Sequence, residues 1–348
     1  MIRSAGDFRE SYRDDLATIR RPGQWLVLLG FIALLYALPL VASQSVVSLI
    51  NRILISVIAV QGLNLVTGYT GQVSLGQAAF MTVGGYCSAL LTLKSGLPFL
   101  LALPLAGLGA GLIGLLFALP SLRVKGFYLT MATLSAQFII PWFTRNAFPE
   151  TLNETQGINV PVPIIFGITF DEPKKYLYLT LTCVIITTIV AYNIVRSRSG
   201  RAFVAVRDNE LAAELLGVHL FKYKLQAFLL AAIYAGIAGA LSAHQLRHIN
   251  YETFDLTNSI LLLGMLVVGG LGTTLGPFFG ATLVLLLIEV ATRLGPQIQQ
   301  IFPNASTTAA RPLLFGFALM LFLIYQPKGL AYRWMRLKAA WRIRPLRK

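Results

Sequence analysis

Apolar stretches about as long as a membrane-spanning helix recur along nearly the whole chain, from Trp25 to Tyr325. A transmembrane helix needs roughly 20 predominantly apolar residues. The composition agrees, because only 12% of residues are charged and 56% are hydrophobic, whereas soluble domains carry about 25% charged residues. The sequence therefore predicts one all-α polytopic membrane bundle of eight to ten helices, rather than the two soluble domains that the length alone would suggest.

Ten candidate spans follow from these stretches. They are about 25–43, 46–66, 74–93, 97–119, 126–143, 176–195, 223–243, 258–275, 276–293 and 309–326. The first follows a charged segment and is too long for the core of a signal peptide, so it is expected to remain as a helix. The third begins in a stretch, Thr67–Gln77, that is too polar and glycine-rich for a lipid-facing helix. Irregular backbone at that depth needs to be buried in protein or to line a cavity.

The 29 basic residues outnumber the 14 acidic ones and lie in a few clusters between the apolar stretches. Nucleic-acid binding is disfavoured, since no soluble basic face with interleaved aromatic residues is present. The positive-inside rule instead places these clusters in the cytoplasm. We therefore expect a basic cytoplasmic segment 1–24, a transmembrane domain 25–327 with a cytoplasmic loop 196–222, and a basic cytoplasmic tail 328–348. Loop 121–126 then lies on the cytoplasmic side. The loop with Glu150, Glu154, Asp171 and Glu172 lies on the external side.

Two apolar segments, Gly62–Gly85 and Gly264–Gly280, are interrupted repeatedly by glycine. They lie in the two halves of the chain, as an inverted repeat would place them. Paired interrupted segments point to the substrate pathway of a transporter, although glycine also permits plain helix packing. Packing is the expected role of Gly107, Gly109, Gly111, Gly114, Gly236 and Gly239. The candidate pathway residues are Asn64, Gly68, Gly71, Gln72, Ser74, Gly76, Gln77, Gly269, Gly270 and Gly272. Backbone amides near Gly71–Gly76 are candidates for binding a substrate carboxylate.

The loop between the sixth and seventh spans contains a short amphipathic helix, expected at about 207–217. Asp208 or Asn209 can cap its start, and Gly217 is placed to end it. Leu211 and Leu215 share one face. Such a helix suits docking into a groove of another protein, and the alternative is a helix lying on lipid headgroups.

This loop resembles the coupling loop of importer permeases of the ATP-binding cassette class, which contacts the ATPase subunit. The matching residues are Arg207, Asn209, Glu210, Leu211, Ala212, Ala213, Glu214, Leu215 and Gly217. Three further motifs, Gly62–Gly76, Gly126–Leu134 and Gly269–Pro277, resemble the LivM type of branched-chain amino-acid permease. The resemblance covers about 55–330. Departures at Gln77 and at Glu154–Gly157 leave urea or amide permeases and aromatic-acid permeases open as alternatives.

The resemblance implies a bacterial inner-membrane importer with several partner subunits. These are ABC ATPases, a second permease of the LivH type and an extracytoplasmic substrate-binding protein, received by Phe143–Lys175 and His244–Thr257. The chain has no Gly-Lys-Ser/Thr triplet and hence no P-loop, so ATP and magnesium are expected in the partners and no cofactor or catalytic residue in this chain. An autonomous secondary transporter is an alternative, but an acidic group in mid-membrane is not evident. A scaffold that transports nothing is another.

The remaining polar residues have simpler expected roles. Arg52 can attract a substrate carboxylate or snorkel to the interface, and Glu289 and Arg293 are expected to form an i,i+4 pair. His244, His248 and Glu252 have helical spacing that could hold a metal, but they are expected to be polar side chains on the surface, and no metal site is expected. His219 is expected at the solvent or partner surface. Cys87 and Cys183 lie in apolar runs, and no disulfide is expected.

Overall fold

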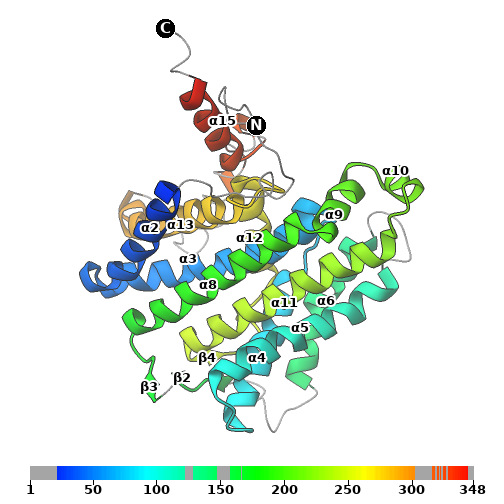
Figure 1. Ribbon diagram of the computed structural model, residues 1–348. Coiled ribbons are helices and arrows are strands. Elements are labelled where there is room, and N and C mark those ends of the chain that lie inside the picture. The colour runs from blue at the N-terminus through cyan, green and yellow to red at the C-terminus, as the bar shows by residue number, and fades with distance from the viewer. Residues whose placement is uncertain are drawn as a thin grey trace.

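A bundle of long helices makes up the part of the chain that the computed structural model describes (Figure 1). The described residues are 22–121, 128–146, 157–165, 167–301, 316, 317, 320, 322, 324–326 and 328–343. The long helices are α2 (Pro22–Val41), α3 (Gln44–Leu63), α4 (Gln77–Leu93), α5 (Phe99–Ser121), α6 (Tyr128–Asn146), α8 (Pro173–Arg196), α11 (Leu220–Leu246), α12 (Leu256–Gly269) and α13 (Gly276–Ile301). The shorter ones are the π-helix η1 (Asn64–Tyr69), α9 (Arg198–Asp208), α10 (Glu210–Leu215) and α15 (Leu330–Ile343).

Nine of the ten expected spans are therefore helices within the described residues, and most of the tenth, 309–326, lies outside them. Five described helical segments are long and apolar enough to cross a membrane: Gln44–Tyr69, Phe99–Pro120, Pro173–Arg196, Leu220–Leu246 and Gly276–Arg293. The all-α polytopic fold is thus confirmed. The eighth span was expected at 258–275 but ends at Gly269, because the glycine-rich residues that follow leave the helix.

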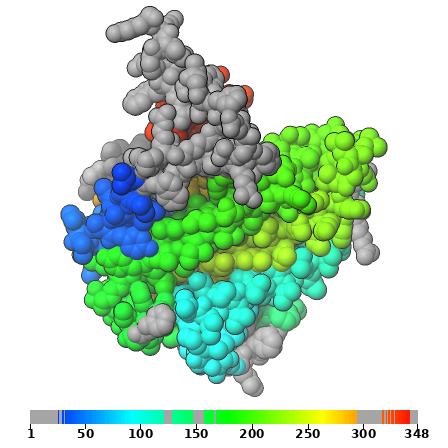
Figure 2. All heavy atoms as spheres, in the orientation of Figure 1, coloured from blue at the N-terminus to red at the C-terminus, as the bar shows by residue number. Residues whose placement is uncertain are grey.

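The core of the bundle surrounds α3 and α11. Helix α11 packs against α3, α4 and α5, and α3 also contacts α8, α12 and α13. Figure 1 shows the axes of α8 and α11 nearly parallel, with the chain running in opposite directions along them, α9 and α10 near one end and the short strands near the other. In Figure 2, α8 (green) lies on the face turned to the viewer, with α2 (blue) against one end of it. Apolar side chains on the outside of α5, such as Leu112 and Leu116, are exposed, as expected for a lipid-facing surface.

Glycines allow α4, α5 and α11 to approach one another closely. A Cβ atom at Gly84 would lie 2.1 Å from the carbonyl oxygen of Gly236, and one at Gly239 would lie 2.0 Å from that of Met81. On α5, a Cβ at Gly107, Gly111 or Gly114 would press against residues of α11. Cβ at Gly109 would contact the sulfur of Cys87. The packing role predicted for these glycines is therefore confirmed.

Short strands close the end of the bundle away from α9. Strand β1 (Ile158–Asn159) pairs antiparallel with β4 (His248–Ile249), and β2 (Ile164–Ile165) with β3 (Ile168–Thr169). The pairing joins the two segments, 143–175 and 244–257, that the sequence places outside, although 147–156 and 166 lie outside the described residues.

Two predictions for the histidines were wrong. Helix α11 ends at Leu246, so His244, His248 and Glu252 do not share a helical face. His244 is 2% exposed rather than a surface residue. Its ring lies 2.9 Å from the Ser88 hydroxyl and 2.9 Å from the Pro161 carbonyl oxygen, so both nitrogens have partners. This arrangement ties α4 and the β1 segment to the end of α11. His219, the N-cap residue of α11, is exposed.

Candidate functional site

The two glycine-interrupted segments are breaks between helices, and they meet. The first break runs through η1 and residues 70–76, between α3 and α4. The second is 270–275, between α12 and α13. The 14 residues of α12 rise about 21 Å, which is less than the roughly 30 Å core of a bilayer. Within the second break, Gly270 is buried, whereas Leu271 and Leu275 are 48% and 43% exposed.

Asn64 joins the two breaks. Its side-chain oxygen accepts a hydrogen bond of 2.9 Å from the Gly272 amide, and its side-chain nitrogen donates to the Thr273 carbonyl oxygen at 2.8 Å. Asn64 is 3% exposed, so these bonds satisfy backbone groups that no helix serves. Gly272 has φ +67°, a conformation that glycine adopts without strain. The two breaks are closely packed at this point, since a Cβ at Gly68 would lie 2.5 Å from the Gly272 nitrogen.

Arg207 connects this junction to the loop between α8 and α11. Its guanidinium Nη1 donates to the Gly68 carbonyl oxygen at 3.1 Å, while Nε and Nη2 bind Asp208. The first break also passes closely by this residue, because a Cβ at Gly71 would lie 3.0 Å from Arg207 Cγ. The sequence placed Arg207 on the coupling helix, but it lies on the preceding helix, α9. That division follows from Asn209, whose extended backbone separates α9 from α10.

Asn209 caps helix α10 and Gly217 follows its end, as the sequence predicts, although the helix spans Glu210–Leu215 and not 207–217. The Asn209 side-chain oxygen accepts a hydrogen bond of 3.1 Å from the Ala212 amide, and Gly217 takes the left-handed conformation, φ +84°. Ala213 is buried, whereas Asn209, Ala212 and Glu214 are exposed. Leu211, Leu215 and Leu216 are 66%, 89% and 84% exposed. An apolar face of this kind, left uncovered in the single chain, suits contact with a partner.

Glu210 holds α10 against the transmembrane helices. Its carboxylate lies 2.6 Å from the Lys224 ammonium on α11, in an ion pair whose lysine is 13% exposed. The sequence predicted Glu210 as a coupling residue without revealing this partner. Movement of α10 therefore has a direct route to α11 as well as, through α9 and Arg207, to the first break.

The amides at the start of α4 already have partners in this structure. Ser259 on α12 accepts from the Ala78 amide at 2.9 Å, and Gln137 on α6 accepts from the Ala79 amide at 2.9 Å. Thr133 on α6 accepts from the Leu75 amide at 3.1 Å. These side chains stabilise a helix start that is buried away from water. Of the amides at Gly71–Gly76 that the sequence offered to a substrate carboxylate, those of Gln72 and Leu75 are occupied by the protein itself.

The remaining candidate pathway residues divide by their contacts. Gln77 is buried and donates to the Ala59 carbonyl oxygen at 2.9 Å, and Ser74 is 2% exposed. Gly76 packs on the backbone of Thr133, Gly269 on that of Gly276 and Gly270 on Ala331. Gln72 is different, because neither its side-chain oxygen nor its nitrogen has a hydrogen-bond partner among the described residues.

Sequence reasoning missed Gln137 and Ser259, and it did not pair Arg52 with Glu289. The signal available was a polar side chain inside an apolar stretch, which at membrane depth marks a functional or structural partner. Thr133 lies in a motif that the sequence analysis used, but its role in capping α4 did not follow from the motif. The sequence alone cannot reveal these partners because they come from helices far apart along the chain.

Comparison with known proteins identifies the family to which the chain belongs. The family described as "Branched-chain amino acid transport system / permease component" matches residues 45–324. The chain is 30% identical to the high-affinity branched-chain amino acid transport system permease protein LivM of Escherichia coli and to that of Salmonella typhimurium, over 331 residues that cover 88% of this chain and 75% of either relative. It is 29% identical to the autoinducer 2 import system permease protein LsrC of an Enterobacter species, over 52% of each chain.

Proposed function

Because the chain belongs to the family of permease components of branched-chain amino acid transport systems, we propose that it forms part of the membrane pathway of an ATP-driven importer for leucine, isoleucine and valine. It is a multi-pass membrane permease subunit, and such subunits work with ATPase and substrate-binding partners. The chain's own part is to bind those partners and to open and close a path for the solute. ATP and magnesium are assigned to the ATPase subunits.

The hydrogen bond from Arg207 to the Gly68 carbonyl oxygen is the observation that most supports this proposal. It connects the loop that bears the exposed leucines of α10 to a break in the transmembrane helices. Asn64 then continues the connection to the second break at Gly272. A rigid-body shift of α10 on the ATPase would therefore reach both breaks through these two side-chain contacts, as movement is transmitted between packed elements with two arrangements.

The mechanism is alternating access at the breaks. Closure of the two ATPases on ATP would push α10, and Arg207 would move the Gly68 carbonyl with it. The junction of Asn64 and Gly272 would then be displaced, and the half-helices α4 and α12 would move relative to α3 and α13. Rocking of discontinuous helices about a central site is a general design of transporters.

The solute is proposed to pass the breaks at Gln72, Gly71, Gly269 and Gly270. The free carboxamide of Gln72 supports this location, since a buried amide without a partner is costly unless something else binds it. The carboxamide offers one acceptor and two donors to an amino-acid ammonium and carboxylate. The occupied amides at the start of α4 would become available only if α6 and α12 move away from it.

The membrane orientation and the assembly are parts of the same proposal. Both termini are placed in the cytoplasm of a bacterium, with the chain in the inner membrane. The position of Gly329, whose Cβ would lie 2.4 Å from Gly270 Cα, supports this orientation, because it puts the start of α15 at the same end of the bundle as the breaks and Arg207. The second permease is proposed to be of the LivH type, and the binding protein to dock on the end that carries β1–β4.

ATP-driven uptake by the complete complex in proteoliposomes tests the proposal. When ATP is supplied in the compartment that holds the ATPases, leucine, isoleucine and valine should accumulate in that compartment. Without ATP they should not accumulate. Urea and an aromatic acid serve as competing solutes. If either is accumulated in preference to leucine, the substrate assignment is wrong, and if uptake proceeds without ATPase subunits, the chain is an autonomous transporter.

Arg207→Ala tests the route of coupling. The variant should still bind the ATPase subunits through α10, but the amount of solute moved per ATP hydrolysed should fall severalfold. Arg201→Ala is the matched control, because Arg201 lies on the same helix and its guanidinium binds the Arg196 carbonyl oxygen instead. Equal coupling in the two variants would exclude the Arg207 route.

A further inference from the structure

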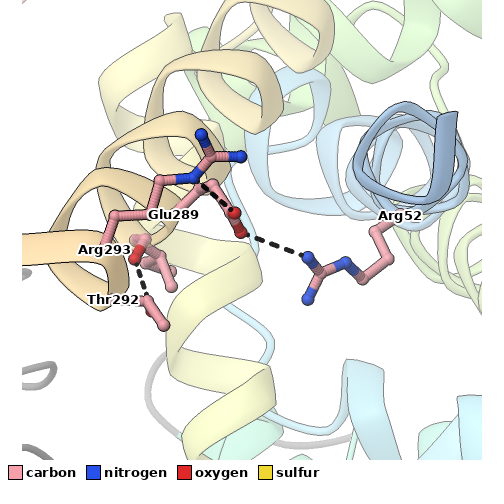
Figure 3. A network of polar contacts seen from close by, with 5 residues as sticks. Arg52, Glu289, Thr292 and Arg293 are labelled. Carbon is pink, nitrogen blue, oxygen red and sulfur yellow. Dashed lines mark hydrogen bonds and ion pairs between the residues drawn. The ribbon is translucent and has the colours of Figure 1, made fainter. Parts of the chain in front are cut away.

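Two arginines from different helices share one carboxylate on the side of the bundle. Arg52 Nη2 on α3 lies 3.4 Å from Glu289 Oε2 on α13, and Arg293 Nε lies 3.1 Å from Glu289 Oε1. Figure 3 shows Glu289 between the two guanidinium groups, which approach it from opposite sides. Within the described residues these three charges form one group, and its sum is one positive charge.

The surplus charge faces outward. The side chains of Arg52 and Arg293 are 54% and 66% exposed, and that of Glu289 is 27% exposed. From Val47 to Tyr69, Arg52 is the one exposed residue of an otherwise covered helix. Two exposed guanidinium groups that share one carboxylate leave one net positive charge, which is expensive beside lipid tails. This position therefore calls for a further anionic group, which no described residue supplies.

The depth of the group fits the headgroup region of a bilayer. Asn51, next to Arg52, donates to the carbonyl oxygen of Pro173 at 3.0 Å, and Pro173 is the first residue of α8. Arg52 is thus level with the start of a membrane-spanning helix, at the end of the bundle opposite α9 and α10. Snorkelling of a long arginine over the last few ångströms is common at such a level.

An apolar stripe leads up to the two arginines. On α13, Leu286 and Val290 are 44% and 54% exposed. They precede Arg293 by seven and three residues, so that all three lie on one face of the helix. A water-filled pathway would be lined by polar groups, whereas this surface is apolar and ends in guanidinium groups. The surface is complementary to a phospholipid, whose acyl chains would lie along the apolar stripe and whose phosphate would lie at the guanidinium groups.

We propose that Arg52 and Arg293 bind the phosphate of an anionic phospholipid, whose acyl chains lie along Leu286 and Val290. A phosphodiester carries one negative charge, which matches the surplus of the group. Guanidinium groups bind phosphate oxygens through paired, charge-assisted hydrogen bonds. Phosphatidylglycerol has no cation of its own, whereas phosphatidylcholine brings a cationic headgroup into the same space. The site therefore selects the anionic lipid. This inference holds whatever solute the protein transports.

Native mass spectrometry of the complete complex, taken from nanodiscs with equal amounts of phosphatidylglycerol and phosphatidylcholine, tests the site. The wild type should retain phosphatidylglycerol in preference. Arg52→Gln and Arg293→Gln should each weaken that retention about fivefold, the factor that corresponds to about 1 kcal/mol per basic residue at a membrane surface. Glu289→Gln should strengthen it, because the surplus rises to two charges. Lys94→Gln, which removes an exposed lysine that follows α4, should leave it unchanged.

Three outcomes would overturn the proposal. Equal retention of the two lipids by the wild type would show that the arginines do not select an anionic headgroup. Loss of phosphatidylglycerol from Arg52→Lys to the same extent as from Arg52→Gln would attribute the effect to packing rather than charge. A cysteine at Val290 that cross-links to the second permease in the assembled complex would show that a protein partner, not lipid, covers this face.

Discussion

The side-chain carboxamide of Asn64 binds the backbone of Gly272, 208 positions further along the chain, at 2.9 Å, and thereby holds two broken helices together. One amide group satisfies a backbone donor and, at Thr273, a backbone acceptor. Because both partners are backbone atoms of a segment without helical hydrogen bonds, the contact determines how the α12–α13 break sits against η1.

Asn64→Leu should destabilise the protein and uncouple transport. The substitution leaves the Gly272 amide and the Thr273 carbonyl without their partner, at a cost of about 1–3 kcal/mol for each buried group. The midpoint of thermal unfolding of the purified complex should fall, and solute uptake per ATP should fall with it. Asn146→Leu, on α6, is the control, since its side chain is exposed and donates to the Trp142 carbonyl oxygen of its own helix. An unchanged midpoint for Asn64→Leu would mean that the junction carries no stability.

Removal of the side chains that cap α4 should weaken the bundle without affecting α10. Ser259→Ala leaves the Ala78 amide unbonded, and Gln137→Leu does the same for Ala79, so each should lower stability by about 1–3 kcal/mol. Thermal unfolding and binding of the ATPase subunits are measured together. Ser135→Ala, also on α6, should change neither, because its hydroxyl is exposed and bonds to the Met131 carbonyl oxygen of the same helix. Loss of ATPase binding before any loss of stability would contradict this separation.

Gly84→Ala should disrupt the packing of α4 on α11. The new Cβ would lie 2.1 Å from the Gly236 carbonyl oxygen, and backbone cannot rotate out of the way as a side chain can. Overpacking of this kind costs about 1–3 kcal/mol or more, so the yield of monodisperse protein in size-exclusion chromatography should drop. A methyl group at Gly30 on α2 meets nothing within 4 Å, and Gly30→Ala should elute like the wild type. Similar elution of Gly84→Ala would show that the two helices can separate freely.

Leu211→Ser with Leu215→Ser should abolish binding of the ATPase subunits while leaving the permease folded. The two side chains are 66% and 89% exposed, so their loss removes no internal packing, but it removes the apolar face of α10. Co-purification from native membranes measures the effect. Leu246→Ser, at the opposite end of α11 and 53% exposed, is the matched control. If the double variant still retains the ATPases, α10 is not the docking helix.

The sequence determined which segments become helices and where they break. Apolar length located nine spans in the described residues, and repeated glycine marked the interrupted segments Gly62–Gly85 and Gly264–Gly280, within which the structure has its breaks. Asn209 and Gly217 gave the start and end of α10, because a cap and a left-handed terminus are local properties. The Glu289–Arg293 pair followed from helical spacing alone.

Tertiary structure decided which polar groups meet. The contacts of Asn64 with Gly272, Arg207 with Gly68, Ser259 with Ala78 and Arg52 with Glu289 each join segments more than 130 residues apart. Local periodicity reports which side of a helix is apolar, but it carries no information on which neighbour that side will face. The burial of His244 also could not be predicted from local periodicity, since its partners Ser88 and Pro161 are brought to it by the packing of other segments. Helices form from short-range hydrogen bonds and residue preferences, whereas their junctions depend on how the whole bundle packs.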